Sequence, residues 1–213
     1  MKVLGISGSP RPGESTERLV REVLSTVEAE TEFISLAGMN IGPCVACLGC
    51  VKDNVCVVND DFAQLRDKLV EADAYVIGAP NYFATLNALT HCFLERFYQF
   101  RHREGRGVAG KLGIAVSVGG GEPGRPLEQL KTFFQYNGIE CVGEVCAQGT
   151  ACCFICGYGE SCRVGSIHRF FGPGTRISEE ITPTLDKQPE KLAEARELGR
   201  LLSRRLGERS AGA

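Results

Sequence analysis

The sequence has no apolar run of about 18 residues, the length that a membrane-spanning helix needs. Its first residues, Met1 to Leu4, show no basic, apolar, cleavable leader. Lysine and arginine total 24 against 26 aspartates and glutamates, so the formal net charge of -2 gives no field that would attract nucleic acid or an anionic membrane. We therefore expect a cytoplasmic protein that binds neither nucleic acid nor a membrane.

Cysteine, in contrast, is abundant, with 11 in 213 residues. A chain of this length buries most of its apolar surface without needing disulfides or metal to fold. In a reducing cytoplasm, many cysteines indicate metal or redox chemistry rather than disulfides. No linker or repeat divides the chain, so we expect one domain over residues 1–213, with a cysteine cluster loop at 43–56 and a cysteine-rich C-terminal insertion at 146–188.

The cluster loop carries its cysteines at the spacing C-x2-C-x2-C-x5-C, at Cys44, Cys47, Cys50 and Cys56. Thiolates so close in sequence suit a compact iron–sulfur cluster, and the first choice is a 4Fe-4S cluster. Zinc is the main alternative, but structural zinc sites usually take ligand pairs from two separated arms, and this run lacks that separation. Free or disulfide-bonded cysteines are the remaining possibility.

The start of the chain predicts an anion site. Residues 2–7 are a short apolar strand, residues 8–16 a polar glycine loop, and a helix follows with Ser15 or Thr16 as its cap. Unpaired N–H groups and the helix dipole face such a loop. Glu14 stands where a P-loop would have its phosphate-binding lysine, which argues against nucleoside triphosphate hydrolysis.

The rest of the chain alternates strands and helices. Further strands are expected near residues 31–36, 75–79, 112–118 and 139–146, and helices from about 60 or 61, after the loop 80–86, at 126–137 and at 189–206. Five such alternations predict a doubly wound α/β fold, a five-stranded parallel sheet with helices on both faces. The loops after the first four strands then meet at one edge of the sheet, where ligands bind in this architecture.

Three segments at that edge resemble the NADPH-dependent FMN reductase group of flavodoxin-like proteins: Ser7 to Arg11, Ala79 to Phe83, and Ser117 to Gly121. With the four cysteines added, residues 1 to 146 look most like the iron–sulfur flavoprotein branch of that group. The resemblance implies a flavodoxin-like fold, FMN and a 4Fe-4S cluster. It also implies a homodimer or dimer of dimers, in which the cluster of one protomer lies near the flavin of another.

The resemblance also implies the flavin contacts, and it needs no catalytic side chain because the cofactor carries the chemistry. The implied contacts of the FMN phosphate are Ser7, Ser9, Pro10, Arg11, Ser15 and Thr16. Those along one side of the isoalloxazine ring are Pro80, Asn81, Tyr82 and Phe83, and those along its other side are Ser117, Gly119, Gly120 and Gly121. FAD is not expected, because no acidic residue follows the second strand to bind an adenosine.

A second cysteine region follows the fifth strand. Its members are Cys146, Cys152, Cys153, Cys156 and Cys162, and they could form a second metal site, a cap of reduced cysteines, or a redox-labile thiol pair. A basic stretch with Arg101, His102, Arg103, Arg106 and Lys111 reads as solvated surface or as a docking patch for an acidic electron carrier or a nicotinamide phosphate.

The sequence therefore predicts a flavin-dependent oxidoreductase: an electron-transfer flavoprotein with FMN and a 4Fe-4S cluster that takes electrons from a small carrier such as ferredoxin. One alternative is an NAD(P)H-dependent FMN or quinone reductase with an auxiliary cluster. A zinc-binding redox sensor is the third reading, and the lack of any DNA-binding element disfavours it.

Overall fold

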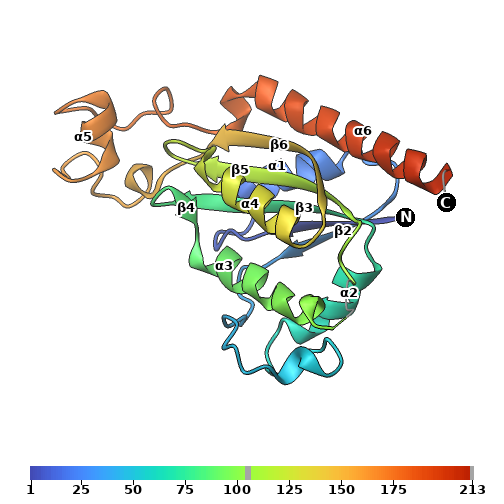
Figure 1. The fold of residues 1–213 in the computed structure, drawn as a ribbon. Coiled ribbons are helices and arrows are strands. Elements are labelled where there is room, and N and C mark those ends of the chain that lie inside the picture. Colours follow the sequence, from blue (N-terminus) through green and yellow to red (C-terminus); the bar gives the residue numbers. More distant parts are fainter. Residues whose placement is uncertain (104–106, 212–213) are drawn as a thin grey trace.

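The computed structural model describes residues 1–103 and 107–211, and a parallel sheet forms its centre (Figure 1). The parallel strands follow the order β2-β1-β3-β5-β6. Their bounds are β1 Lys2–Ser7, β2 Glu30–Ser35, β3 Ala74–Tyr82, β5 Leu112–Gly119 and β6 Glu140–Gln148. A short strand, β4 (Thr85–Leu86), pairs antiparallel with the end of β3. This order confirms the expected flavodoxin-like fold.

Helices cover both faces of the sheet. The α-helices are α1 Ser15–Leu24, α2 Arg66–Glu71, α3 Ala88–Glu95, α4 Arg125–Tyr136, α5 Ser166–Phe171 and α6 Pro189–Ala211. The 3-10 helices are η1 Gly49–Val51, η2 Ala63–Leu65, η3 Arg96–Arg101, η4 Cys152–Phe154 and η5 Leu185–Lys187. Helices α1 and α6 pack together on one face, and α2, α3 and α4 lie on the other (Figure 1). None of the described helices is both long and apolar enough to cross a membrane.

Two hydrophobic cores arise because side chains alternate across a strand. In β1, Val3 packs into the core under α1 and α6, whereas Leu4 packs into the core under α2, α3 and α4. In β3, Val76 and Tyr75 divide in the same way. Strands buried on both faces read as continuous apolar runs, which is why the sequence revealed them.

Several boundaries differ from the expectation. The helix expected from Asp60 or Asp61 begins as an α-helix only at Arg66, after η2, because the Asp60 carboxylate accepts the N–H of Phe62 and closes a turn there. The segment expected as a loop at 80–86 is instead a β-hairpin, in which β3 runs on to Tyr82 and pairs with β4.

The strand order reverses between β1 and β3, which both end at the same edge of the sheet. A segment that contains α5, which we call the C-terminal lobe (residues 151–180), projects beyond this edge (Figure 1). The cysteine loop projects separately, beneath α3. The fold thus places both cysteine regions outside the layered body of the protein.

Candidate functional site

Buried hydroxyl groups gather at the carboxyl edge of the sheet. Each of the five serines and threonines concerned is at most 8% exposed: Ser7, Ser9, Ser15, Thr16 and Ser117. Strand register explains part of this arrangement, since Ser7 pairs with Gly78 of β3 and the next residue of β3, Ala79, pairs with Ser117. Buried polar groups are normally hydrogen-bonded. The Ser117 hydroxyl nevertheless has no partner among the described residues, so this edge has a buried hydroxyl that a ligand could hydrogen-bond.

The loop after β1 has the features of a phosphate site. Arg11 donates one guanidinium N–H to the carbonyl of Thr150 at 3.0 Å, while its buried Nη1 has no partner in the described part of the chain. Helix α1 begins at Ser15 with Glu14 at the N-cap, and no side-chain cap bond is made. The expectation that Ser15 or Thr16 caps the helix is therefore wrong. First-turn N–H groups without a capping oxygen suit an anion, and the free guanidinium nitrogen suits it further.

A carboxylate in the first turn of α1 is already satisfied. Burial alone would raise the pKa of Glu17, but hydrogen bonds from the Gly13 N–H and the Arg21 guanidinium hold its pKa below the usual range. Glu17 is thus ionised, and it holds the loop by accepting the Gly13 N–H. Its negative charge is paired with Arg21, which leaves Arg11 to face an incoming anion.

Two residues that the sequence analysis did not single out hold this loop in place. Asn87, the N-cap of α3, donates from its side-chain amide to the carbonyl of Gly8 at 2.8 Å. Thr90 donates to the Asn87 side-chain oxygen. A Cβ on Gly8 would lie only 1.9 Å from Thr90 Oγ1, so the position requires glycine. An asparagine directly before an apolar helix is a start signal that could have identified Asn87.

The hairpin at the end of β3 forms a second wall. Phe83 and Ala84 at its turn have φ values of 55° and 65°, and Phe83 is fully exposed. Left-handed conformations are unfavourable for a bulky residue, and they concentrate at functional sites. Tyr82 and Phe83 are 42% and 100% exposed at this hairpin, and their contact with the flavin ring stays a prediction.

The loop after β5 faces this hairpin. The side-chain amide of Asn81 donates to the carbonyls of Gly121 and Glu122 at 3.0 and 2.9 Å, which joins the two loops. Asn81 Oδ1 is buried and lacks a partner among the described residues. A Cβ on Gly120 would lie 2.5 Å from the Cβ of Ala151, where the C-terminal lobe begins. The expected loops 7–16, 80–83 and 117–121 are thus brought to one edge.

The cysteine loop is anchored by a buried ion pair. Arg96 and Asp60 have side chains 0% and 7% exposed, and Arg96 also donates to Cys56 Sγ at 3.2 Å. Gln99 accepts the Cys56 N–H at 2.9 Å and Glu95 accepts the Cys44 N–H at 3.1 Å. The end of α3 and the start of η3 therefore position the first and last cysteines of the motif.

The four thiols lie close enough to influence one another. Burial raises the pKa of the Cys50 thiol, and the neighbouring thiols of Cys56, Cys44 and Cys47 raise it further. Within residues 1–103 and 107–211, no three histidine, cysteine, aspartate or glutamate side chains converge tightly enough to hold a single metal ion. A cubane cluster distributes its four ligands over four irons, so it does not require such convergence. An all-thiol donor set on one loop fits that group.

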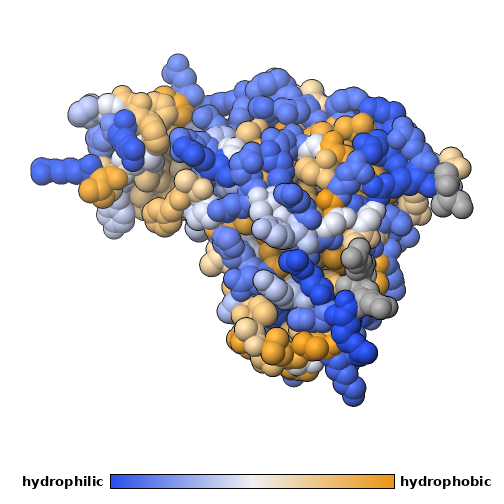
Figure 2. Space-filling model, in the orientation of Figure 1, coloured by the Kyte–Doolittle hydropathy of each residue, from blue (hydrophilic) through white to orange (hydrophobic). Residues whose placement is uncertain are grey.

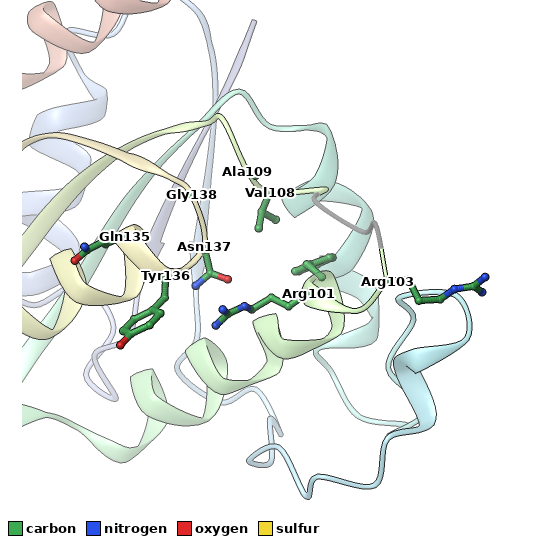
Figure 3. Close-up of a pocket in the computed structure, with 9 residues that line it drawn as sticks. Arg101, Arg103, Val108, Ala109, Gln135, Tyr136, Asn137 and Gly138 are labelled. Carbon is green, nitrogen blue, oxygen red and sulfur yellow. The ribbon is translucent and has the colours of Figure 1, made fainter.

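The basic stretch borders a cavity of about 380 Å³, which Arg101 and Arg103 both line (Figure 3). Arg101, Arg103, Tyr136 and Asn137 are among its walls, whereas Arg106 lies outside the described residues. The cavity also touches Gly138 and Ala109, which precede β6 and β5. It therefore opens at the amino edge of the sheet and does not belong to the site at the carboxyl edge.

Comparison with known proteins identifies relatives of the first two thirds of the chain. The family model described as NADPH-dependent FMN reductase matches residues 1–151. An iron–sulfur flavoprotein of Methanocaldococcus jannaschii is 37% identical over 150 residues, which cover 68% of this chain and 77% of the relative. An iron–sulfur flavoprotein of Methanosarcina thermophila is 29% identical over 150 residues, covering 68% and 78%.

Solved structures share the architecture. A flavone reductase matches with a TM-score of 0.61 and 21% identity over 96% of this chain and 62% of its own, so this chain spans less than two thirds of that protein. An archaeal flavodoxin matches with a TM-score of 0.51 and 11% identity, covering 97% and 99%. Identities this low show the fold alone.

Proposed function

Because this chain belongs to the NADPH-dependent FMN reductase family, in its iron–sulfur flavoprotein branch, we propose that it is an electron-transfer flavoprotein with a 4Fe-4S cluster. The family makes it a flavin-dependent oxidoreductase that uses FMN. We further propose that its electrons come from a small reduced carrier such as ferredoxin. When bound, FMN supplies one- or two-electron chemistry and the cluster supplies one-electron chemistry, so a two-electron transfer could be divided into single steps.

The flavin phosphate is assigned to the loop after β1. The observation that carries this assignment is the buried, unpartnered Nη1 of Arg11 beside a helix N-terminus without a side-chain cap. Arg11 would pair with the phosphate charge, and the buried hydroxyls and first-turn N–H groups would complete its hydrogen bonds. The proposed phosphate ligands are Ser7, Ser9, Pro10, Arg11, Ser15 and Thr16.

The isoalloxazine ring is assigned to the space between the hairpin and the loop after β5. Pro80 to Phe83 would lie along one side of the ring, and Ser117 with Gly119 to Gly121 along the other. The unpartnered Oδ1 of Asn81 and hydroxyl of Ser117 support a polar ligand here. These groups would orient the ring and shield it from water, and no side-chain acid or nucleophile is needed.

The cluster is assigned to Cys44, Cys47, Cys50 and Cys56. Arg96 supports this assignment because its N–H···S contact would stabilise a ligating thiolate, and hydrogen bonds to cluster sulfurs also tune their potential. The same loop exposes apolar side chains, and Figure 2 shows apolar surface where it lies. The exposed members are Val45, Leu48, Val51 and Val55, and Val57 directly after the loop is exposed as well.

An exposed apolar loop favours an interface. We propose that this surface is covered in a homodimer or a dimer of dimers. We also propose that residues 1–213 form one domain. Residues 1–103 and 107–211 include all eleven cysteines, and all eleven are free, which supports a reducing, cytoplasmic location.

An NAD(P)H-dependent FMN or quinone reductase with an auxiliary cluster is the second candidate, because the matching family is described by its NADPH dependence. Oxidation of NADPH by the purified protein, followed anaerobically, would separate the two. We expect flavin reduction by reduced ferredoxin to be faster than by NADPH. The reverse order would assign the protein to the second candidate.

The decisive experiment uses Cys50→Ser. This variant should lose or degrade the cluster but retain FMN, since the proposed flavin ligands come from other loops. Its flavin should still be reduced by dithionite, but slowly or not at all by reduced ferredoxin. Wild-type rates with ferredoxin in a cluster-free variant would show that electrons reach FMN directly, and would refute the proposed role of the cluster.

A further inference from the structure

The C-terminal lobe repeats part of the cysteine loop. Cys153, Cys156 and Cys162 have the spacing C-x2-C-x5-C, which is also the spacing of Cys47, Cys50 and Cys56. The family match ends at residue 151, before the first of these three cysteines. The FMN site does not use them. The lobe therefore carries a thiol motif for which the proposed function has no role.

The lobe has almost no hydrophobic core of its own. Ile167 is the only large apolar side chain of residues 151–180 that is buried, while Ile155, Tyr158 and Val164 are 61%, 74% and 95% exposed. Its regular structure consists of η4 and the six-residue α5. Ordering the backbone costs about 1–2 kcal/mol per residue, and units this small normally need disulfides or metal to offset that cost. No disulfide joins its cysteines, all of which are described.

The thiols of the lobe gather around one stretch of backbone. Cys153 Sγ accepts the N–H of Ser166 at 3.3 Å, and Cys162 Sγ lies 3.2 Å from where a Cβ on Gly165 would be. Two sulfurs thus flank the adjacent residues Gly165 and Ser166. An N–H···S bond of this kind is a usual partner of a metal-bound thiolate.

Cys156 lies one turn from Cys153. Its N–H donates to the Cys152 carbonyl at 2.9 Å, and its Sγ lies 3.8 Å from the Cys153 carbonyl oxygen. The backbone folds back here, because a Cβ on Gly159 would be 2.0 Å from the Cys153 carbonyl oxygen. Gly157 has a φ of +80°, a left-handed conformation that glycine adopts without strain, and it turns the chain between Cys156 and Cys162.

We propose that Cys153, Cys156 and Cys162 hold a second thiolate-bound metal centre of the iron–sulfur type, separate from the one in the cysteine loop. The three sulfurs do not meet at a single-ion site in the described residues, and neither do the four of the cysteine loop. Both thiol sets therefore reach ligating geometry as the metal binds and the thiols lose their protons. A ligand other than these three thiols completes the centre. The centre goes beyond the proposed function and does not depend on it.

The test counts metal and sulfide in the full-length protein. After anaerobic preparation, we expect about eight iron and eight sulfide per wild-type chain, and about four of each in the triple variant Cys153→Ser, Cys156→Ser, Cys162→Ser. The quadruple variant with serine at residues 44, 47, 50 and 56 should also keep about four of each, now in the lobe. Cys141→Ser, which alters a half-buried thiol on β6 outside both motifs, is the matched control and should equal wild type.

The outcomes separate the two centres. Zinc that is present at about one per wild-type chain and absent from the triple variant would overturn the iron–sulfur centre in favour of a zinc site on the same thiols. Equal iron, sulfide and zinc in wild type and triple variant would overturn the proposal. The iron that the quadruple variant loses relative to wild type reports on the cysteine loop only. Failure of the proposed function is therefore distinguished from failure of the lobe proposal.

Protease digestion covers the case in which the triple variant misfolds. Because the lobe has so little core, removing metal from the wild-type protein with a chelator should accelerate cleavage within residues 151–180 by about tenfold or more. Cleavage within the lobe at the same rate before and after chelation would contradict a metal that orders it. FMN absorbance of each sample shows whether the remainder of the protein is intact.

Discussion

The two cysteine regions share a spacing and differ in what supports them. The loop at 43–56 rests on a buried ion pair between Arg96 and Asp60, with Gln99 and Glu95 holding its backbone. The lobe at 151–180 has no buried ion pair among the described residues and only one large apolar side chain that is buried, Ile167; hydrogen bonds such as that from the Ile177 N–H to the Glu160 carboxylate hold it instead. A ligand spacing therefore does not specify the structure that supports it. The protein body organises the first region, and we propose that bound metal orders the second.

The largest expected effect is at Arg96. Arg96→Ala should destabilise the protein by about 3–5 kcal/mol, because it leaves the Asp60 carboxylate buried without its counter-charge. Urea denaturation of the wild type and variant measures this change. Arg96→Lys keeps the charge and should lose less, since lysine cannot reproduce the planar fork of donors.

The matched control for Arg96 lies in the lobe. Arg163 is exposed there, and Arg163→Ala should leave the unfolding midpoint unchanged. If both arginine variants were equally stable, the Arg96–Asp60 ion pair would not support the cysteine loop. The contrast between the two cysteine regions would then be refuted.

Arg11 connects the flavin edge with the root of the lobe through Thr150. Arg11→Ala should weaken FMN binding by about 10- to 100-fold, which corresponds to the roughly 1.5–3 kcal/mol of a charged hydrogen bond. Fluorescence titration of the apoprotein with FMN measures the dissociation constant. Arg101→Ala, an exposed arginine at the opposite edge, is the control, and equal affinities in the two variants would remove the phosphate assignment.

Acid should weaken the cysteine loop through Asp60. Burial alone would raise the pKa of Asp60, but the Arg96 guanidinium and the N–H groups of Gly42 and Phe62 hold its pKa below the ordinary value of 3.8. A carboxyl whose pKa is lowered by folding contributes stability above 3.8 and loses it as the pH falls towards the folded pKa.

The measurement for Asp60 is urea denaturation between pH 6 and pH 3. Wild type should exceed Asp60→Asn in stability at pH 6, and the difference should shrink as the pH drops below about 4. A difference that stays constant over this range would show that the Asp60 charge does not support the loop.

The smallest effect is expected in the lobe. Phe170 is 61% exposed, and Phe170→Ala should change the free energy of unfolding by no more than about 0.5 kcal/mol. Phe97, 1% exposed in the core beneath α3 and η3, is the contrast, and Phe97→Ala should cost about 3–5 kcal/mol. A large loss for Phe170→Ala in metal-free protein would reveal a lobe core that its exposure does not suggest.

Much of the fold was predictable because its signals are local. Runs such as Val3 to Ile6 and Tyr75 to Ala79 are apolar on both faces, and that pattern identifies buried parallel strands. Parallel strands then place the loops after β1, β3 and β5 at one edge, so the grouping of Ser7, Asn81 and Ser117 followed from topology. The hairpin at 80–86 was missed because Phe83 and Ala84 adopt left-handed conformations that their residue types disfavour.

The alternation of strands and helices, the edge at which the loops meet and the spacing of both thiol motifs can be read from the residues alone, since each depends on positions near one another along the chain. Which thiol motif is supported by a buried ion pair follows from the packing of distant segments. Arg96 lies 36 residues from Asp60, and Arg11 lies 139 residues from Thr150. Pairing over such separations depends on how the layers pack, and no local pattern encodes it. The same packing left the lobe outside the core, with Ile167 as the one large apolar side chain buried in residues 151–180.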